Sequence, residues 1–141
     1  MPLQLTADEL NFMSDKALCD LLLNQGAYAA GYLQERGIDP TTPHLFRFMR
    51  NGKLRYPHFQ FLLDDECKPS GIRFIIPLIN AMNTDRYGVD RDEDEAHRAY
   101  LLRFWITPIT ALGGVGAYEA LLSGRYTHRQ IQQGILSLWI N

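Results

Sequence analysis

The stretch from Tyr100 to Leu121 constrains the fold more than any other part of the chain. Its first part has the pattern of the last turns of a helix, and Pro108 disfavours a helical residue before it, so the helix should end there. Three glycines then follow within Leu112–Gly116, where they allow positive φ angles and close backbone approach. A second, short helix is predicted over Ala117–Ser123, closed by Gly124. The stretch therefore predicts two helices joined by a tight turn.

The composition fits one ordinary domain, or a small domain with an appended helical module. The chain has 141 residues, 46% apolar and 21% charged, and a formal net charge of −2, which argues against a highly basic nucleic-acid binder but leaves a local basic face open. No apolar run approaches the roughly 20 residues that span a bilayer, and the N-terminus lacks the pattern of a secretion signal. Cys19 and Cys67 lack metal-site spacing, which favours reduced thiols over a disulfide or metal pair. We therefore expect a cytoplasmic protein without a membrane segment.

The first part of the chain predicts three helices. Thr6–Glu9 has the pattern of a capping box, and apolar residues then repeat with helical spacing, so one helix is expected from there to about Asn24. A second helix is expected over Ala27–Arg36. Thr42 before a proline is a typical helix start, which places a third helix over Pro43–Arg50. The segment is thus helix-turn-helix-like.

The rest of the chain predicts a short β element and then more helices. Alternating residues over Lys53–Phe61 suggest short strands, with Pro57 confining them to an edge or a turn. A helix is expected to start near Pro77, with Leu78, Ile79 and Met82 facing the core. A loop is expected over Asn83–Arg91. Further helices are expected from the acidic run Asp90–Glu95 to Trp105 and over Thr127–Trp139.

Together these elements predict a mainly α fold. We expect a helical bundle with a helix-turn-helix-like N-terminal segment over residues 1–55. A helical domain over residues 56–141 would follow, with the small β element lying in the middle of the chain.

One basic cluster is a candidate site for DNA contact. Arg47 and Arg50 are three residues apart on the expected helix over Pro43–Arg50 and therefore share a face. Such a face is typical of a recognition helix, with neighbouring cations on phosphates. The alternative is a solubilising face on a structural helix, because the turn is poorly spaced and Pro43 occupies a position where an apolar residue usually packs. The candidate DNA-binding residues are Thr42, His44, Arg47, Arg50, Lys53 and Arg55.

The sequence has no recognisable catalytic or metal-binding pattern. Its four histidines lack metal-ligand spacing and triad order. The Gly113–Gly116 loop superficially suggests a phosphate cradle, but a helix rather than the strand of a βαβ unit precedes it. The acidic run Asp90–Glu95 fits a solvated helix N-terminus better than a metal or basic-partner site. We therefore expect a protein that is not an enzyme and uses no cofactor or metal; a small enzyme is the less favoured alternative.

Two segments resemble the toxin-binding domain of the Xre/MbcA/ParS antitoxins. Tyr56-Pro-His-Phe-Gln-Phe61 matches a Tyr-Pro-x-Phe-Gln-Phe segment of that family. Family members also carry a tryptophan near a helix end, an Asn-Pro-type turn and then Leu-Gly-Gly-x-x-Pro-x-Glu-x-Leu. Ile109-Thr110 and Ala117 depart from that pattern. The residues that match it are Trp105, Leu112, Gly113, Gly114, Glu119 and Leu121.

The resemblance, which covers about half the chain, implies an antitoxin that binds and blocks a cognate toxin. In that family the toxin is often a RES-domain enzyme that uses NAD. The resemblance implies toxin contacts by the matching residues and by the C-terminal end with Trp139, and repression of the protein's own operon through operator DNA. Apolar residues near a chain end often mark partner or dimer contacts, so we expect a homodimer. For Trp139 alone, the alternative is that it packs onto the protein's own core. The alternative is a homo-oligomeric interaction or adaptor protein that binds no DNA, which the weak basic face favours.

Overall fold

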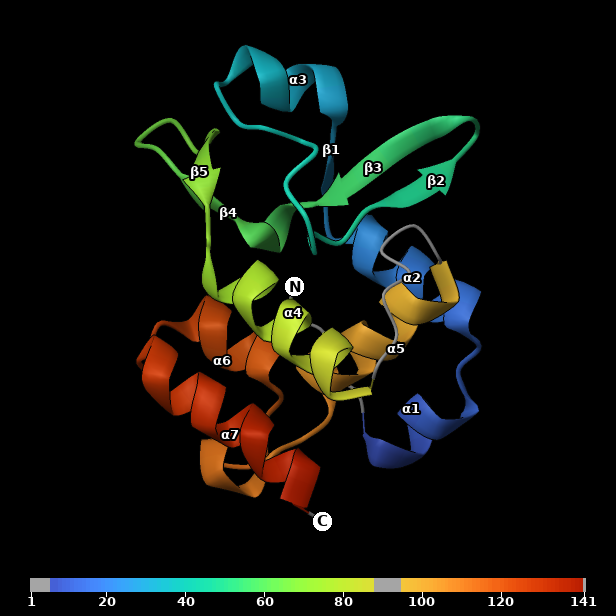
Figure 1. Ribbon diagram of the computed structural model, residues 1–141, viewed down its shortest axis with the longest axis vertical. Coiled ribbons are helices and arrows are strands. Elements are labelled where there is room, and N and C mark those ends of the chain that lie inside the picture. The colour runs from blue at the N-terminus through green and yellow to red at the C-terminus, as the bar shows by residue number, and fades with distance from the viewer. Residues whose placement is uncertain (1–5, 88–94, 141) are drawn as a thin grey trace.

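The fold is mixed α/β, and the expected helical bundle is wrong. The computed structural model describes residues 6–87 and 95–140, which form seven α-helices and five strands in two small antiparallel sheets. Both sheets and one short helix gather at one end of the molecule, and most of the helices gather at the other (Figure 1). The bundle expectation failed because extended backbone replaces helix over two segments of the first half.

The N-terminal helix is divided in two by a second cap. It consists of α1 (Ala7–Phe12) and α2 (Asp15–Asn24). The Thr6 hydroxyl accepts from the Glu9 backbone N–H at 3.1 Å, as the capping box predicts. The Ser14 hydroxyl does the same for the Ala17 N–H at 3.1 Å. Met13 and Ser14 both have extended φ and ψ, so α1 ends at Phe12 and Ser14 starts α2 as its N-cap. The uninterrupted apolar pattern concealed this break.

A three-stranded sheet follows where two helices were expected. Its strands are β1 (Ala27–Ala29), β2 (Phe48–Arg50) and β3 (Lys53–Pro57), in the order β1-β3-β2, and α3 (Ala30–Glu35) lies between β1 and β2 in the chain. The helix expected over Pro43–Arg50 is therefore wrong. Asn51 and Gly52, with φ of 53° and 75°, form the two-residue turn between β2 and β3. An Asn-Gly pair between apolar residues is a strong hairpin signal, and here it overrides the helix-start signal of Pro43.

The predicted strands around Tyr56–Phe61 are confirmed, and this segment joins two cores. A short 3₁₀ turn (His58–Gln60) connects β3 to β4 (Phe61–Leu63), which pairs with β5 (Pro69–Ile72). Tyr56 and Phe61 belong to a small core with Leu33 and Leu45, whereas Phe59 enters the large helical core. All three rings are at most 2% exposed. The segment therefore ties the sheets to the helices.

The second half is helical, with boundaries that differ partly from those expected. Its helices are α4 (Ile75–Tyr87), α5 (Glu95–Ile106), α6 (Ala117–Ser123) and α7 (His128–Ile140). The end of α5 before Pro108 and the bounds of α6 are confirmed. The start of α4 tolerates Pro77 in its first turn, and the helix continues through residues expected to form a loop. Most of the acidic run, Asp90–Asp94, lies outside the described residues. Within the part described, no helix is long and apolar enough to cross a membrane.

The position of Phe59 predicts a large loss of stability on truncation. Its ring lies 4.8 Å from the Tyr118 ring and 6.1 Å from the Trp105 ring, centroid to centroid. Phe59→Ala should lower the free energy of unfolding by about 3–5 kcal/mol, because it removes a fully buried ring and leaves a cavity. Urea denaturation would measure this loss. Phe12→Ala is the matched control, since Phe12 is 89% exposed; equal effects of the two changes would contradict the core described here.

Candidate functional site

Three of the residues expected to contact a toxin are buried. Trp105, Leu112 and Leu121 are 0%, 1% and 6% exposed. The Trp105 indole N–H donates to the Asn80 side-chain oxygen at 3.0 Å, and the Asn80 amide donates to the His44 backbone carbonyl at 2.8 Å. This chain of hydrogen bonds holds α4 between α5 and the loop before β2. In this structure Trp105 therefore helps to position the helices.

The glycine-rich turn, Leu112–Gly116, packs against α7 and supports it. Gly113 and Gly114 have φ of 73° and 88°, as the sequence predicted. Gly116 serves close approach instead, because a Cβ atom there would lie 2.9 Å from the Ile106 carbonyl group. Leu112 packs on Gly134 of α7, where an added Cβ would lie 3.2 Å from the leucine side chain. The turn thus fixes α7 against the end of α5.

The remaining toxin candidates are more accessible. Gly113 and Gly114 are exposed at the turn, and Glu119 on α6 is partly exposed. The side chain of Trp139 lies outside the described part of the structure.

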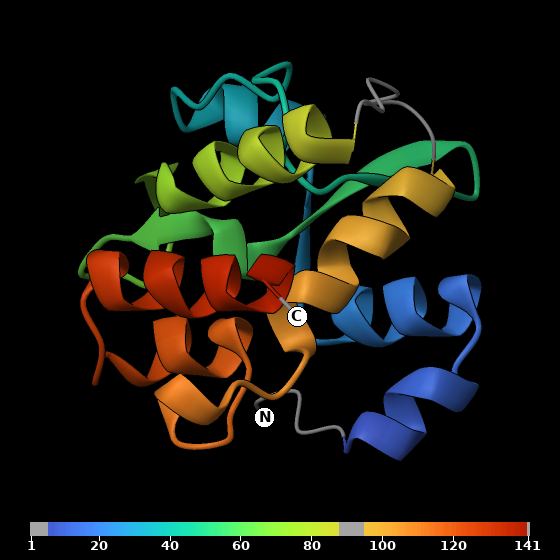
Figure 2. The same ribbon diagram turned by 60° about the horizontal axis from the view of Figure 1, so that its bottom comes forward.

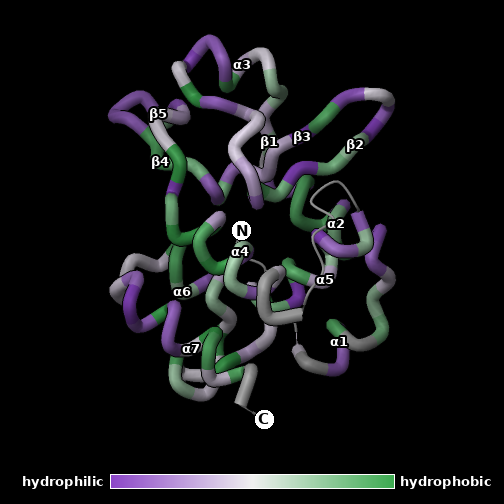
Figure 3. Tube along the Cα trace, viewed as in Figure 1, coloured by the Kyte–Doolittle hydropathy of each residue, from purple (hydrophilic) through white to green (hydrophobic). Residues whose placement is uncertain are grey.

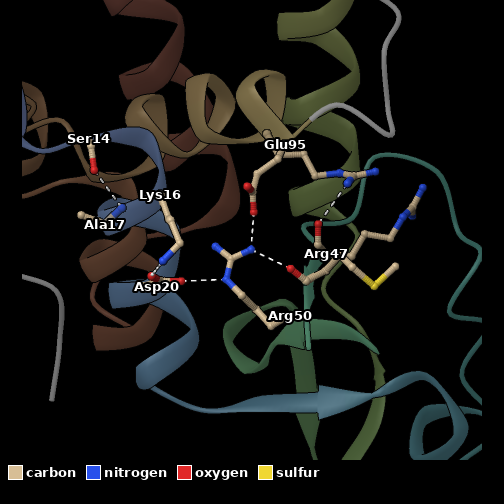
Figure 4. Close-up of polar contacts among 9 residues, drawn as sticks. Ser14, Lys16, Ala17, Asp20, Arg47, Arg50 and Glu95 are labelled. Atoms are coloured by element: carbon tan, nitrogen blue, oxygen red, sulfur yellow. Dashed lines mark hydrogen bonds and ion pairs between the residues drawn. The ribbon is translucent and has the colours of Figure 1, made fainter. Parts of the chain in front are cut away.

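The candidate DNA-binding residues do not share a helix. Arg50 lies between two carboxylates, with its Nε 2.8 Å from Asp20 of α2 and another nitrogen bonded to Glu95 of α5 (Figure 4). The hydrogen bond to Glu95 raises the pKa of Arg50, and the hydrogen bond from Arg50 lowers the pKa of Asp20. Arg50 therefore links three elements through charge pairs that already neutralise it.

The other candidate DNA-binding residues lie in the loop before β2 and on the β2–β3 hairpin. The Thr42 hydroxyl donates to the Asp39 carbonyl at 2.8 Å, and Arg47 donates to the Thr42 carbonyl at 3.4 Å. His44 has a φ of 67°, which a helix does not allow. Lys53 is exposed and Arg55 half-buried on β3. Arg47 also borders a hollow of about 380 Å³, whose other lining residues are Phe48, Met49, Leu54, Glu95 and Arg98.

An exposed apolar groove between α4 and α7 is the feature that the sequence reasoning missed. Phe74 and Leu78 are 70% and 51% exposed, so the expectation that Leu78 faces the core is wrong. The groove has a volume of about 440 Å³, and its lining residues are Phe74, Ile75, Pro77, Leu78, His128 and Gln132. Figure 3 shows the hydrophobic start of α4. A signal was present: α4 is apolar on more than one face, which in a surface helix indicates a second contact.

The motif residues support both walls of this groove. Asn80, bonded to Trp105, belongs to α4, and Gly134, packed on Leu112, belongs to α7. The two helices are in contact and lie side by side (Figure 2). Trp105 and Leu112 therefore help to position the two helices that form this surface.

The turn itself predicts a strain effect. Gly114→Val should lower the free energy of unfolding by about 1–3 kcal/mol, because a β-branched residue is strained at a φ of 88°. Gly31→Val in α3 is the control, since Gly31 also has open space around an added Cβ but no left-handed φ; it should change stability by less than about 0.5 kcal/mol. Thermal melts of both variants measure the difference, and an unchanged melting temperature for Gly114→Val would contradict a constrained turn.

Comparisons with known proteins assign no family to this arrangement. No protein-family model, curated protein or solved structure matches the chain. The resemblance to the Xre/MbcA/ParS antitoxins thus depends on the residues of Tyr56–Phe61 and of the Trp105–Leu121 stretch alone.

Proposed function

We propose that the chain is an antitoxin-type module that binds and blocks a cognate toxin protein. The observation that carries this proposal is the exposed apolar groove between α4 and α7, with Phe74 70% exposed. Large apolar side chains gathered in a groove are typical of a protein-binding surface. The resemblance identifies the expected partner as a toxin, in that family often a RES-domain enzyme that uses NAD.

The location of the resembling residues supports the same proposal. Trp105 and Leu112 are buried and hold the two helices of the groove, α4 through Asn80 and α7 through Gly134. A binding surface needs rigid elements beneath it, so these residues serve recognition by preorganising the two helices. The proposal thus assigns the contact to the exposed residues of the groove.

The second candidate is an interaction or adaptor protein that binds no DNA. It is favoured by Arg50, which is neutralised by Asp20 and Glu95, and by the absence of helical backbone over Pro43–Arg50. Both candidates bind proteins, and they differ in the partner.

The toxin proposal predicts rescue that depends on the groove. Cells that express the product of the neighbouring open reading frame, the candidate toxin, should grow again when this chain is co-expressed. The Phe74→Ser/Leu78→Ser double variant should abolish this rescue because it removes the exposed apolar contacts. Phe12→Ser/Leu63→Ser is the control, since both residues are exposed elsewhere. Circular dichroism and urea denaturation would verify that each variant folds. If the wild-type chain fails to rescue, the antitoxin proposal is wrong; if the groove variant rescues fully, the groove is not the contact.

The charge pairs of Arg50 predict the outcome of a DNA-binding test. We expect no shift of the protein's own promoter fragment in a gel at low salt, where contacts to phosphates are strongest. A shift lost in Lys53→Ala/Arg55→Ala and weakened by added salt would contradict this expectation. It would assign operator binding to the β2–β3 hairpin.

A further inference from the structure

The groove is basic along its α7 wall. His128 lines the groove, Arg129 follows it in α7 and Arg125 lies in the loop just before this helix, while no Asp or Glu follows Glu119 in the sequence. Within the described residues, Arg125 and Arg129 form no ion pair, and both are exposed.

Three other arginines of the fold do form ion pairs. Arg36, Arg50 and Arg103 each pair with at least one carboxylate. These three arginines are thus neutralised, whereas the described residues offer no carboxylate partner to Arg125 and Arg129.

The helices add to this positive charge. In both views α4 and α7 run side by side with their N-termini at the same end (Figures 1 and 2). Neither helix has an acidic residue in its first turn, so nothing there offsets the positive end of the dipoles. The groove lies at this end, because its lining residues come from the first turns of both helices.

The shape of the groove selects the form of its occupant. Phe74 and Leu78 are one helical turn apart and strongly exposed, and Ile75 and Pro77 complete an apolar lining of α4. A groove between two helices accepts the apolar face of a third, with contacts spaced at i, i+3, i+4 and i+7.

We propose that this groove binds an acidic amphipathic helix of the partner protein. The apolar face of that helix packs against Phe74 and Leu78, and its carboxylates face Arg125 and Arg129. The identity of the partner rests on the proposed function, whereas the acidic helix follows from the charge and shape of the groove.

The test uses the ¹⁵N-labelled full chain and two synthetic helical peptides. Both carry leucines at i, i+3, i+4 and i+7; one has glutamates at its other positions and the second has lysines. Because the chain has a formal net charge of −2, a non-specific Coulomb preference would favour the lysine peptide. We expect saturable binding of the glutamate peptide alone, with amide shifts centred on Phe74, Leu78 and Gln132.

Charge-reversal variants assign the binding to the basic α7 wall. Arg125→Glu/Arg129→Glu should weaken binding of the glutamate peptide by about tenfold or more, because it replaces attraction by repulsion. Lys53→Glu is the matched control on the distant β2–β3 hairpin and should leave the affinity unchanged. All three positions are exposed, so the variants should fold.

Other occupants are distinguishable outcomes. Equal binding of both peptides, shifts away from the groove, or no binding of the glutamate peptide would overturn the proposal. Self-association that Leu78→Ser abolishes would assign the groove to a second copy of the chain. Binding to phosphatidylserine vesicles would assign the groove to a lipid surface. Either result would also overturn the proposal of an acidic helix. Peptide binding without rescue from the toxin would instead refute only the antitoxin function. Rescue that survives Arg125→Glu/Arg129→Glu would refute only the acidic helix.

Discussion

The buried carboxamide of Gln60 is the interaction on which the arrangement of the two cores depends. Its nitrogen donates to the Phe46 carbonyl at 2.9 Å and to the Pro57 carbonyl at 3.1 Å, and its oxygen accepts from the Phe46 N–H. Phe46 lies in a loop without a neighbouring strand, so its backbone groups would otherwise be buried without partners, at a cost of about 1–3 kcal/mol each. Only a side chain that both donates and accepts satisfies all three groups, and glutamate or leucine would not.

Charged links of a similar kind attach the outer elements. Arg103 donates to the Leu10 carbonyl at 2.8 Å and the Met13 carbonyl at 2.9 Å, and it pairs with Asp15 at 3.1 Å. These carbonyls belong to the C-terminal part of α1 and the residue after it, where a cation is favourable. Arg103 lies in the last turn of its own helix, α5, but it acts at the end of another helix, which only the tertiary arrangement specifies.

The parts of the fold predicted from sequence are those controlled by local chemistry. Pro108, Gly113, Gly114 and Gly124 dictate backbone geometry within a few residues, and the helices and turn around them were predicted correctly. The failures arose where two local signals competed. At Ser14 a cap interrupted a continuous apolar pattern, and at Asn51-Gly52 a hairpin signal opposed a proline helix start. The α4–α7 groove was missed because exposure of Leu78 depends on which face α4 turns toward its neighbours, and the apolar residues surrounding it in the sequence do not reveal that choice.

The burial of the motif residues decides how their substitutions must be interpreted. Leu112 is 1% exposed and packs against α7. A charge at this position would therefore disrupt the packing of α7, and it would not lie on the surface that a partner contacts. A loss of binding in such a variant would report on the position of α7 and the integrity of the groove. Recognition itself is tested at Phe74, Leu78 and the surrounding arginines, where side chains can change while the core beneath them stays intact. Substitutions in the buried motif and on the groove surface thus act on the same binding event, the first through the scaffold and the second through the contact.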